Sequence, residues 1–354
     1  MGASWTRRAL LLSLPAPLLA TRGQVFPPER TRYADGATEL EVNRLTSPEH
    51  QSFLPAPHAR SASSRGGFLI YSSDRGGSLQ VCRMDIRSGE SRILTEASQL
   101  LPDSVTMLAD EKSAVYFDGQ TLKLAQTGGG SRDRELYTCD SGGSFAAGLS
   151  SSDDGLQAAF MVRNGSKATL MYVATNKAGA QKIVDVPPEA SLPLLRPRRA
   201  AVLYRTADSL WLVSFDGQEN RRLKTPPGEI RAPQWSPDGR SILYLLGTEL
   251  REHTPDTNSD TSVAKTSQFG TFGRNADASV FVGASKSLAQ PYVLLMLRIT
   301  RRELAICEHR CSNPLLVNPV FAPSSQRIYF QSDQGGKMAI YTMAVERLVE
   351  KTES

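Results

Sequence analysis

The sequence contains few of the residues on which many enzymes and small secreted proteins depend. Its 354 residues include only four cysteines and four histidines. Four cysteines in a chain of this length are too few for a disulfide framework. We find no glycine-rich phosphate loop, no Gly-x-Ser-x-Gly motif and nothing that suggests a Ser/His/Asp triad. The motifs therefore give no support to a phosphate-loop nucleotide enzyme or a serine hydrolase.

Two of the cysteines, Cys307 and Cys311, flank His309 in the stretch CEHRC. They could form a local disulfide in an oxidising compartment, remain two inert thiols, or bind a metal ion together with His309. Because no second cluster of ligands is present, a metal site is the least favoured of the three.

Long runs of basic residues and of helix-forming residues are also absent. The formal net charge of +5 arises from 41 Lys and Arg against 36 Asp and Glu, without a basic stripe and interleaved aromatic residues. We therefore expect no nucleic-acid partner. With 40% hydrophobic and 22% charged residues, the composition is typical of a soluble globular protein rich in turns.

The N-terminal residues 1–23 are arranged like a signal peptide. Arg7 and Arg8 precede an apolar run from Ala9 to Ala20, which is too short to span a bilayer comfortably. The paired arginines also look like a twin-arginine signal, with a general secretory signal or a retained anchor as the alternatives. We expect an exported protein, periplasmic or extracellular, without a transmembrane segment in the mature chain.

An apolar strand pattern recurs seven times along the chain. Its matching residues, 38 to 48 positions apart, are Tyr71, Tyr116, Phe160, Tyr204, Tyr244, Val282 and Phe330. A period of about 40 to 45 residues with several short strands per unit is typical of propeller blades. We predict an all-β, monomeric, seven-bladed β-propeller over residues 41–347, with a linker at 24–40 and a tail at 348–354.

The first and last repeats share the motif Ser-Asp-x-Gly-Gly, in SDRGG (73–77) and SDQGG (332–336). We interpret the motif as a turn between strands, in two blades that become neighbours where the ring closes. Residues 41–46, EVNRLT, resemble a closing strand but precede the first complete blade, so they are expected to complete the last one and cover its open edge. Residues 249–266 have little apolar periodicity and are predicted to form an exposed loop on one rim.

The order of these motifs resembles that of the oligogalacturonate lyase family, seven-bladed propellers that cleave short polygalacturonates. The resemblance covers roughly residues 40–346 and lies in RLT, IYSSDRGG, the Arg-Met-Asp of CRMDI, SGESRILTE, WLVSFDGQENRRLKT, WSPDG and PVFAPSSQRIYFQSDQGGKMAIY. Similar turns and strands also occur in TolB-like propellers, whereas the order of the motifs and the sequence of the final blade are more specific. By resemblance, the ligand is an acidic oligosaccharide held over the central channel.

The reaction of that family removes a proton next to a uronate carboxylate. A cation on the carboxylate stabilises the developing negative charge while a base takes the proton. The resemblance implies a manganese ion held by three histidines and a glutamine, a further histidine as base, and an assisting arginine. The corresponding positions hold Asn313, Leu316, Asn318 and Thr271 for the metal, Ala232 for the base and Ser209 for the arginine. None keeps the family residue, so we expect no metal site, no cofactor and loss of metal-dependent elimination.

Two arginines lie close in sequence to the vacated positions. Arg205 and Arg231 are the candidate catalytic residues of a rearranged lyase site, because a guanidinium can hold a carboxylate through two hydrogen bonds. Asn313, Asn318 and Thr271 are the candidate substrate-binding residues. The alternative is that both arginines are solvated rim charges on a non-catalytic exported propeller, which binds carbohydrate or a protein ligand on its rim.

The histidines outside CEHRC are not expected to perform chemistry. His50 and His58 lie in the proline-rich stretch SPEHQSFLPAPHARS, where a surface role or a turn contact is favoured over catalysis. His253 lies in the predicted rim loop and is expected to be incidental.

Overall fold

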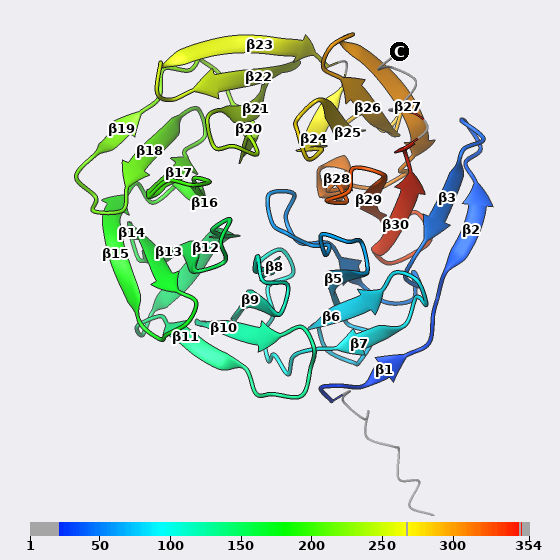
Figure 1. The fold of residues 1–354 in the computed structure, drawn as a ribbon, viewed down its shortest axis with the longest axis horizontal. Helices are drawn as coiled ribbons and strands as arrows, with labels where there is room; N and C mark the ends of the chain where they lie inside the picture. Colours follow the sequence, from blue (N-terminus) through cyan, green and yellow to red (C-terminus); the bar gives the residue numbers. More distant parts are fainter. Residues whose placement is uncertain (1–20, 267, 347, 349–354) are drawn as a thin grey trace, which may run out of the picture.

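A computed structural model of the chain describes residues 21–346 and 348, apart from residue 267. It shows seven antiparallel sheets arranged as blades around a central axis (Figure 1). The prediction of an all-β, seven-bladed propeller is confirmed. Most of the predicted signal peptide and of the C-terminal tail lies outside the described residues. None of the described residues belongs to a helix long and apolar enough to cross a membrane.

Each blade has four strands that follow one another outward from the axis, and two blades have a fifth. Blade 1 contains β4 (Ser52–Phe53), β5 (Phe68–Ser73), β6 (Gln80–Asp85), β7 (Ser91–Ile93) and β1 (Val25–Phe26); blade 2 contains β8 (Thr106–Met107), β9 (Ser113–Asp118), β10 (Thr121–Gln126) and β11 (Arg134–Thr138); blade 3 contains β12 (Gly143–Ser151), β13 (Gln157–Asn164), β14 (Lys167–Ala174) and β15 (Ala180–Val186). Blade 4 contains β16 (Ser191–Leu195), β17 (Ala201–Arg205), β18 (Leu210–Ser214) and β19 (Asn220–Arg222); blade 5 contains β20 (Ile230–Trp235), β21 (Ile242–Leu246), β22 (Glu249–Thr254) and β23 (Ser259–Lys265). Blade 6 contains β24 (Phe269–Arg274), β25 (Val280–Ser285), β26 (Tyr292–Leu297) and β27 (Arg302–Glu308); blade 7 contains β28 (Val320–Phe321), β29 (Arg327–Ser332), β30 (Ala339–Ala344), β3 (Glu41–Arg44) and β2 (Thr31–Ala34).

The second strand of each blade is the repeated apolar segment. These strands are buried on both faces because each blade packs against a neighbour on either side, as the fully buried strand β9 shows. The outermost strands contact solvent, and β19 is exposed along its whole length. The apolar pattern that identifies a strand in the sequence is therefore strong in the strands near the axis and weak in those at the periphery.

Four of the repeated tyrosines use their hydroxyl groups to fix the outer part of their own blade. Each hydroxyl is buried near a polar side chain from the outer strand region and forms a hydrogen bond with it, since a buried tyrosine hydroxyl needs such a partner. The pairs are Tyr71 with Ser91, Tyr116 with Asp133, Tyr204 with Asn220, and Tyr244 with Asp260. The repeat thus carries one polar contact as well as the apolar strand.

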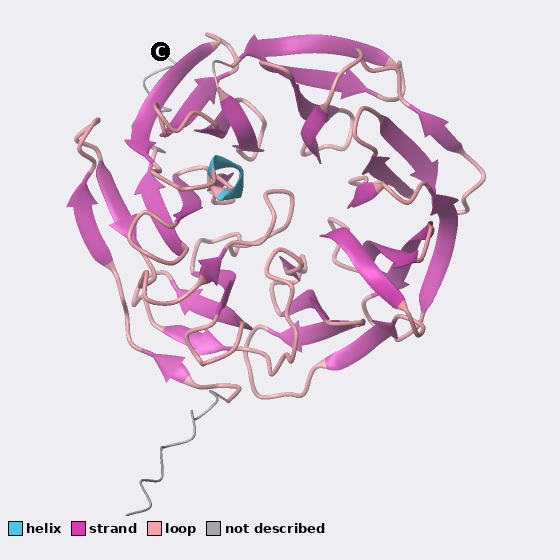
Figure 2. Cartoon of the chain, turned by 180° about the vertical axis from the view of Figure 1, so that it is seen from behind, coloured by secondary structure: helices cyan, strands magenta, loops and turns pink. Residues whose placement is uncertain are grey.

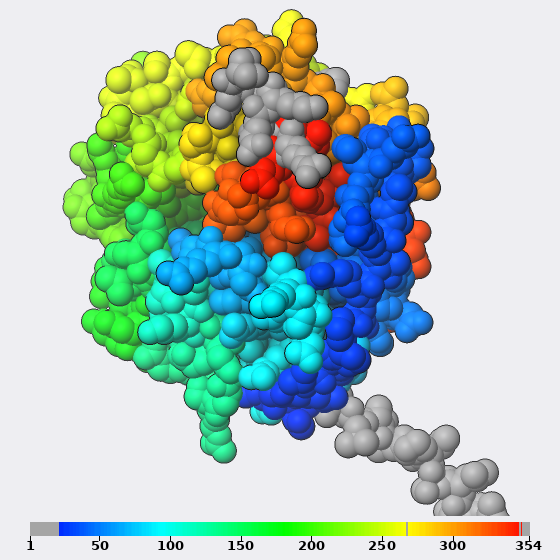
Figure 3. Space-filling view, turned by 45° about the vertical axis from the view of Figure 1, so that its right-hand side comes forward, coloured from blue at the N-terminus to red at the C-terminus, as the bar shows by residue number. Residues whose placement is uncertain are grey.

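The chain segment before the first blade holds the ring together at its seam. Strand β3 pairs with β30, with Asn43 opposite Thr342, so an N-terminal strand lies in the last blade. Figure 3 shows the N-terminal strands (blue) against the C-terminal residues (orange and red). Residues 24–40, predicted to be a linker, are instead paired: β1 lies along β7 of blade 1 and β2 along β3 of blade 7. Strands this short and exposed carry too little apolar pattern to be recognised in sequence.

Residues 249–266 do not form the predicted rim loop. They form the hairpin of β22 and β23, which supplies the outer half of blade 5. The segment is polar because its strands lie at the periphery, and this explains its missing periodicity. His253, expected to be incidental, is completely buried in β22, with its Nδ1 atom 3.4 Å from Asp260.

The Ser-Asp-x-Gly-Gly motifs form equivalent turns in blades 1 and 7. The amide of Gly77 donates to the carbonyl of Asp74 at 2.8 Å, and the amide of Gly336 to that of Asp333 at 3.0 Å. Each aspartate also accepts a hydrogen bond from the backbone that leads into its own blade, at Gln51 and Ser312. The motif therefore stabilises the entry to a blade and is architectural.

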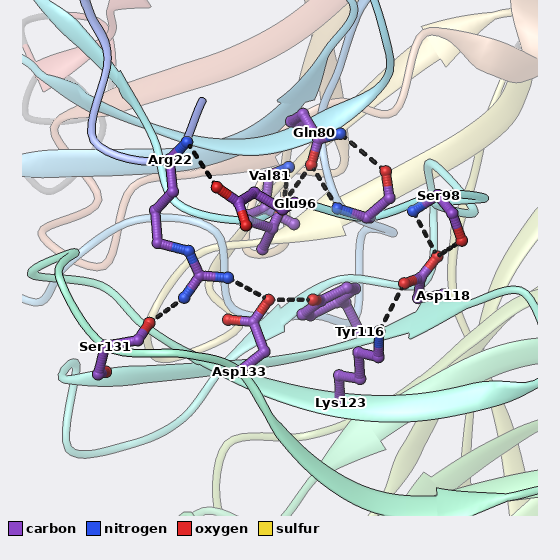
Figure 4. Close-up of polar contacts among 12 residues, drawn as sticks. Arg22, Gln80, Val81, Glu96, Ser98, Tyr116, Asp118, Lys123, Ser131 and Asp133 are labelled. Atoms are coloured by element: carbon purple, nitrogen blue, oxygen red, sulfur yellow. Dashed lines mark hydrogen bonds and ion pairs between the residues drawn. The ribbon is translucent and has the colours of Figure 1, made fainter. Parts of the chain in front are cut away.

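Arg22 attaches the start of the described chain to blade 2. Its guanidinium forms an ion pair with Asp133 at 2.6 Å and donates to the carbonyl of Ser131, and its amide donates to Glu96 (Figure 4). Asp133 accepts the hydroxyl of Tyr116 as well. Arg22 falls inside the segment 1–23 predicted as a signal peptide, so a mature chain that keeps this ion pair begins at or before Arg22.

Candidate functional site

All seven blades contribute to a cavity of about 580 Å³ at one mouth of the central channel. We call it the arginine cavity, because Arg205 and Arg231 line it; Ala232, Thr271, Leu316 and Asn318 line it too. Five of the residues singled out from the sequence thus lie around one space, together with Leu316, which the resemblance aligns with a metal ligand. They meet because equivalent points on the inner strands of a propeller face the same axis.

Irregular backbone directs side chains into this cavity. The inner strands of blades 4, 5 and 6 each contain a break in register, at Ser191/Leu194, Arg231/Gln234 and Phe269/Thr271. Such bulges re-aim side chains and are frequent beside functional sites. Ala232 and Asn318 have positive φ angles of 46° and 45°, a conformation that is costly for a residue with a side chain. Irregular backbone therefore occurs at two of the positions that the sequence singled out, Ala232 and Asn318.

Arg205 presents a cation without a carboxylate partner. Its Nη1 atom donates to the carbonyl of Ile230 at 2.7 Å, which fixes the guanidinium at the junction of blades 4 and 5. No ion pair involves Arg205 among the described residues. Burial lowers the pKa of Arg205, and the charge of Glu229 opposes this shift.

Arg231 is held in the same way. Its Nη2 atom donates to the carbonyl of Gly247 at 2.9 Å, and Nη1 lies 3.4 Å from the carbonyls of Phe269 and Gly270. It has no acidic partner among the described side chains. Both candidate arginines are therefore fixed by backbone carbonyls, and neither forms an ion pair among the described residues, although the charge of Glu229 acts on Arg205.

The three candidate binding residues differ in position. The hydroxyl of Thr271 is buried without a hydrogen-bond partner, and Asn318 lines the arginine cavity beside it. Asn313 lies outside this cavity, in an adjoining one that it shares with Arg231 and Lys286. Its side-chain oxygen accepts the amide of Leu315 at the start of the 3₁₀ turn η1 (Pro314–Leu316), close to the middle of the ring in Figure 2.

The residues in the metal positions do not fit a manganese ion. Leu316 has no donor atom, and the neutral oxygens of Asn318 and Thr271 are poor substitutes for imidazole on a transition metal. We find no group of three or more His, Cys, Asp or Glu side chains arranged to hold a metal within the described part of the chain. Metal-assisted elimination therefore has no support from this donor set.

The positions that the resemblance assigns to the base and to the assisting arginine hold other residues, Ala232 and Ser209. Ala232 lines the cavity but has no proton acceptor in its side chain. Ser209 is buried and donates to Asp208, and it does not line the cavity. Arg205, four residues earlier, is the side chain of blade 4 strand β17 that lines the cavity.

His58, for which the sequence favoured a surface role or a turn contact over catalysis, also lines the arginine cavity. It lies on residues 54–61, which we call the crossing loop because they extend from β4 into the middle of the ring (Figure 1). The loop contacts blade 7 through Leu54 and Gln331, and blade 3 through the Nε2 atom of His58 and the carbonyl of Leu149 at 3.2 Å. Burial lowers the pKa of His58 to about 4, so it is neutral at neutral pH. The prolines at 55 and 57 were the available signal, since they interrupt the inner strand of blade 1.

The CEHRC stretch is structural. His309 is fully buried, with Nε2 2.9 Å from the carbonyl of Ser285, and Nδ1 accepts the amide of Cys311. Cys307 and Cys311 are buried free thiols, and burial raises the pKa of both. The arrangement matches two inert thiols around a histidine that organises the backbone.

The chain is thus a seven-bladed propeller with a cavity at one mouth of its channel. No protein-family model and no curated protein matches the sequence. The structure is similar to that of an oligogalacturonate lyase in complex with manganese, with 18% identity, 92% of this chain and 98% of that chain covered, and a TM-score of 0.85. An oligogalacturonate lyase from Vibrio parahaemolyticus is 18% identical, with 92% and 99% covered and a TM-score of 0.83. TolB from Acinetobacter baumannii is 12% identical, with 82% of each chain covered and a TM-score of 0.50.

These identities are low, so the similarities establish the fold alone. The fold is that of the oligogalacturonate lyases, and the resemblance noted in the sequence is confirmed at that level. The substrate and the activity are matters for proposal.

Proposed function

We propose that the arginine cavity binds acidic, uronate-type oligosaccharides and that the protein does not cleave them by metal-assisted elimination. One observation carries the proposal: Arg205 and Arg231 line one cavity, each held by backbone carbonyls and neither paired with a carboxylate in the described chain. A pre-positioned guanidinium binds a carboxylate through charge-assisted hydrogen bonds and loses little entropy in doing so. The similarity to oligogalacturonate lyases supports the choice of ligand class.

The side chains at the positions that the resemblance assigns to the metal and the base support binding over turnover. A lyase of this kind needs a cation at the carboxylate and a base near the adjacent carbon. The cavity offers Leu316, Asn318, Thr271 and Ala232 at those places. The arginines can hold a uronate but cannot accept a proton, because a guanidinium stays protonated.

Calorimetric titration with tri-galacturonate tests the proposal. Each charge-assisted hydrogen bond contributes about 1.5 to 3 kcal/mol, so Arg205→Ala or Arg231→Ala should weaken binding about 10- to 150-fold. The matched control is Arg240→Ala, whose side chain is 83% exposed and lines neither mouth of the channel. Equal affinities for all three variants would refute the proposal.

Two further readouts separate binding from catalysis. Incubation with manganese and tri-galacturonate should give no rise in the ultraviolet absorbance of an unsaturated product. A rise that Asn318→Ala abolishes would instead establish a rearranged lyase site.

A protein ligand is the second candidate, and one observation favours it. Leu315 and Leu316 are 52% and 45% exposed at the edge of the arginine cavity. Adjacent exposed leucines are typical of contact surfaces. The hairpin 249–266 no longer supports this candidate, because it is part of blade 5. The double substitution Leu315→Ser and Leu316→Ser tests this candidate. If the ligand is a uronate, the affinity for the sugar should stay within about threefold of that of the parent protein. If the ligand is a protein, the double substitution should abolish its association.

We also propose that the protein is exported, on the basis of Arg7, Arg8 and the apolar run that follows them. Fractionation of cells that produce the full chain should place it outside the cytoplasm. Retention of the protein in the cytoplasm would contradict the proposal.

A further inference from the structure

The central channel contains a second cavity, of about 440 Å³, at its other end. We call it the serine cavity, because Ser61, Ser64, Ser150, Ser151 and Ser152 line it. The inner strands run from one cavity to the other. In blade 4, residues 191 and 192 line the arginine cavity, and residues 194, 195 and 197 line the serine cavity. Pro57 and His58 of the crossing loop border both spaces, as does Gln234 of blade 5, so the two chambers adjoin at this loop.

The serine cavity carries positive charge. Arg274 is fixed by the carbonyls of Trp235 at 2.8 Å and Asn275 at 3.2 Å, and no ion pair involves it among the described residues. Burial lowers the pKa of Arg274 to about 10 and the charge of Asp238, which forms no ion pair with it, opposes this shift, so Arg274 is still a cation at neutral pH. Arg60 is half-buried, and its guanidinium has no hydrogen bond or ion pair within the described chain. The one acidic side chain in the lining is Asp153.

The cavity also offers neutral donors that the fold does not use. The hydroxyls of Ser61, which is buried, and Ser64, which is exposed, form no hydrogen bond with the described residues, although the backbone of each does, that of Ser64 with the carboxylate of Glu111. A buried or half-buried cation without a partner is costly unless a counter-charge is supplied. Two guanidinium groups and free hydroxyls together offer more donors than the two oxygens of one carboxylate require. They suit a tetrahedral oxyanion with several acceptor oxygens.

We propose that the serine cavity binds a phosphate group, supplied either as free inorganic phosphate or as a phosphate ester of a small sugar. Arg60 and Arg274 supply the counter-charge, and Ser61 and Ser64 donate to the remaining oxygens. The crossing loop keeps this ligand apart from anything bound in the arginine cavity. The proposal does not depend on the function proposed for that cavity.

Arg60→Ala is the decisive variant. Its side chain holds no other group in place, whereas replacement of Arg274 would also release two backbone carbonyls and disturb the fold. Calorimetric titration of the full chain at low ionic strength uses inorganic phosphate, a hexose 6-phosphate and the unphosphorylated hexose as probes. Arg205→Ala, in the other chamber, and Arg240→Ala, on the surface, are the matched controls.

We expect one phosphate group per chain, no binding of the unphosphorylated hexose, and an affinity at least tenfold weaker in Arg60→Ala. Both controls should stay within twofold of the parent protein. A tenfold preference for the ester identifies a sugar phosphate as the ligand, and equal affinities identify free phosphate. The proposal is overturned if neither probe binds at millimolar concentration, if Arg60→Ala binds as the parent does, or if Arg205→Ala removes binding instead.

Discussion

Gln331 fastens the crossing loop to blade 7, and its replacement gives a quantitative test of this arrangement. Its side chain is 2% exposed, with Oε1 accepting the amide of Leu54 at 2.7 Å and Nε2 donating to the carbonyl of Leu316 at 2.6 Å. Gln331→Leu keeps much of the volume but leaves both backbone groups without that partner. A buried polar group that loses its partner costs about 1 to 3 kcal/mol, so the two together cost about 2 to 6 kcal/mol.

The expected shift in melting temperature follows from the length of the chain. An entropy of unfolding of about 2.1 cal/mol/K per residue gives about 0.7 kcal/mol/K for this protein, so 1 kcal/mol lowers Tm by about 1.4 °C. Gln331→Leu should therefore lower Tm by about 3 to 9 °C. It should also speed hydrogen exchange at the Leu54 amide, which is out of contact with water in the folded state.

The same substitution at Gln326 is the matched control. Gln326 is an exposed residue of blade 7 whose amide donates to Glu346, and surface changes of this kind usually stay within about 0.5 kcal/mol. Calorimetry and site-resolved hydrogen exchange measure the two effects. The reasoning fails if Gln331→Leu lowers Tm by less than 1 °C and leaves exchange at Leu54 unchanged.

Three other perturbations probe the fold. Asp133→Asn breaks a partly buried ion pair and should lower the free energy of unfolding, measured by chemical denaturation, by about 1 to 3 kcal/mol. Asp185→Asn breaks an exposed ion pair and should lower it by less than about 1 kcal/mol. Equal effects of the two substitutions would contradict this. His58 binds a proton near pH 6.5 when unfolded but only near pH 4 when folded. The free energy of unfolding should therefore fall as pH drops from 6.5 to 4, and it should fall less in His58→Gln. Parallel plots of this free energy against pH for the two proteins would contradict the prediction. Gly283→Ala brings its Cβ within 2.4 Å of an aromatic ring and should cost about 1 to 3 kcal/mol, whereas Gly128→Ala meets nothing within 4 Å and should be neutral.

The number of blades and the position of their second strands could be predicted because these strands are buried on both faces. Tyr71 and Tyr244 are each fully enclosed, and the apolar residues around them repeat at a near-constant spacing. The sequence did not predict the outer strands β22 and β23, because part of their surface contacts solvent and polar residues are tolerated there. A short exposed strand such as β1 is defined by its pairing with β7, which no local pattern encodes.

The candidate site could be predicted in part, for a geometric reason. Arg205, Arg231, Thr271 and Asn318 belong to four different blades, and the repeat alone brings equivalent positions to the axis. Asn313 lies in the adjoining cavity and not in the arginine cavity, because it precedes the turn η1. His58 was missed since its loop departs from the repeat, and a feature present in one blade only leaves no periodic signal.

The paired N-terminal segment has a consequence for how the molecule reaches its final state. Strands β1 and β3 belong to blades 1 and 7, so this segment bridges the seam between the two ends of the ring. Asn43 and its partner Thr342 are nearly 300 positions apart in sequence. Contacts of such separation form late, because the entropy of closing the intervening chain must be lost first. We therefore expect the pairing of the N-terminal strand β3 with β30, which closes the ring, to form late in folding, after the blades between them.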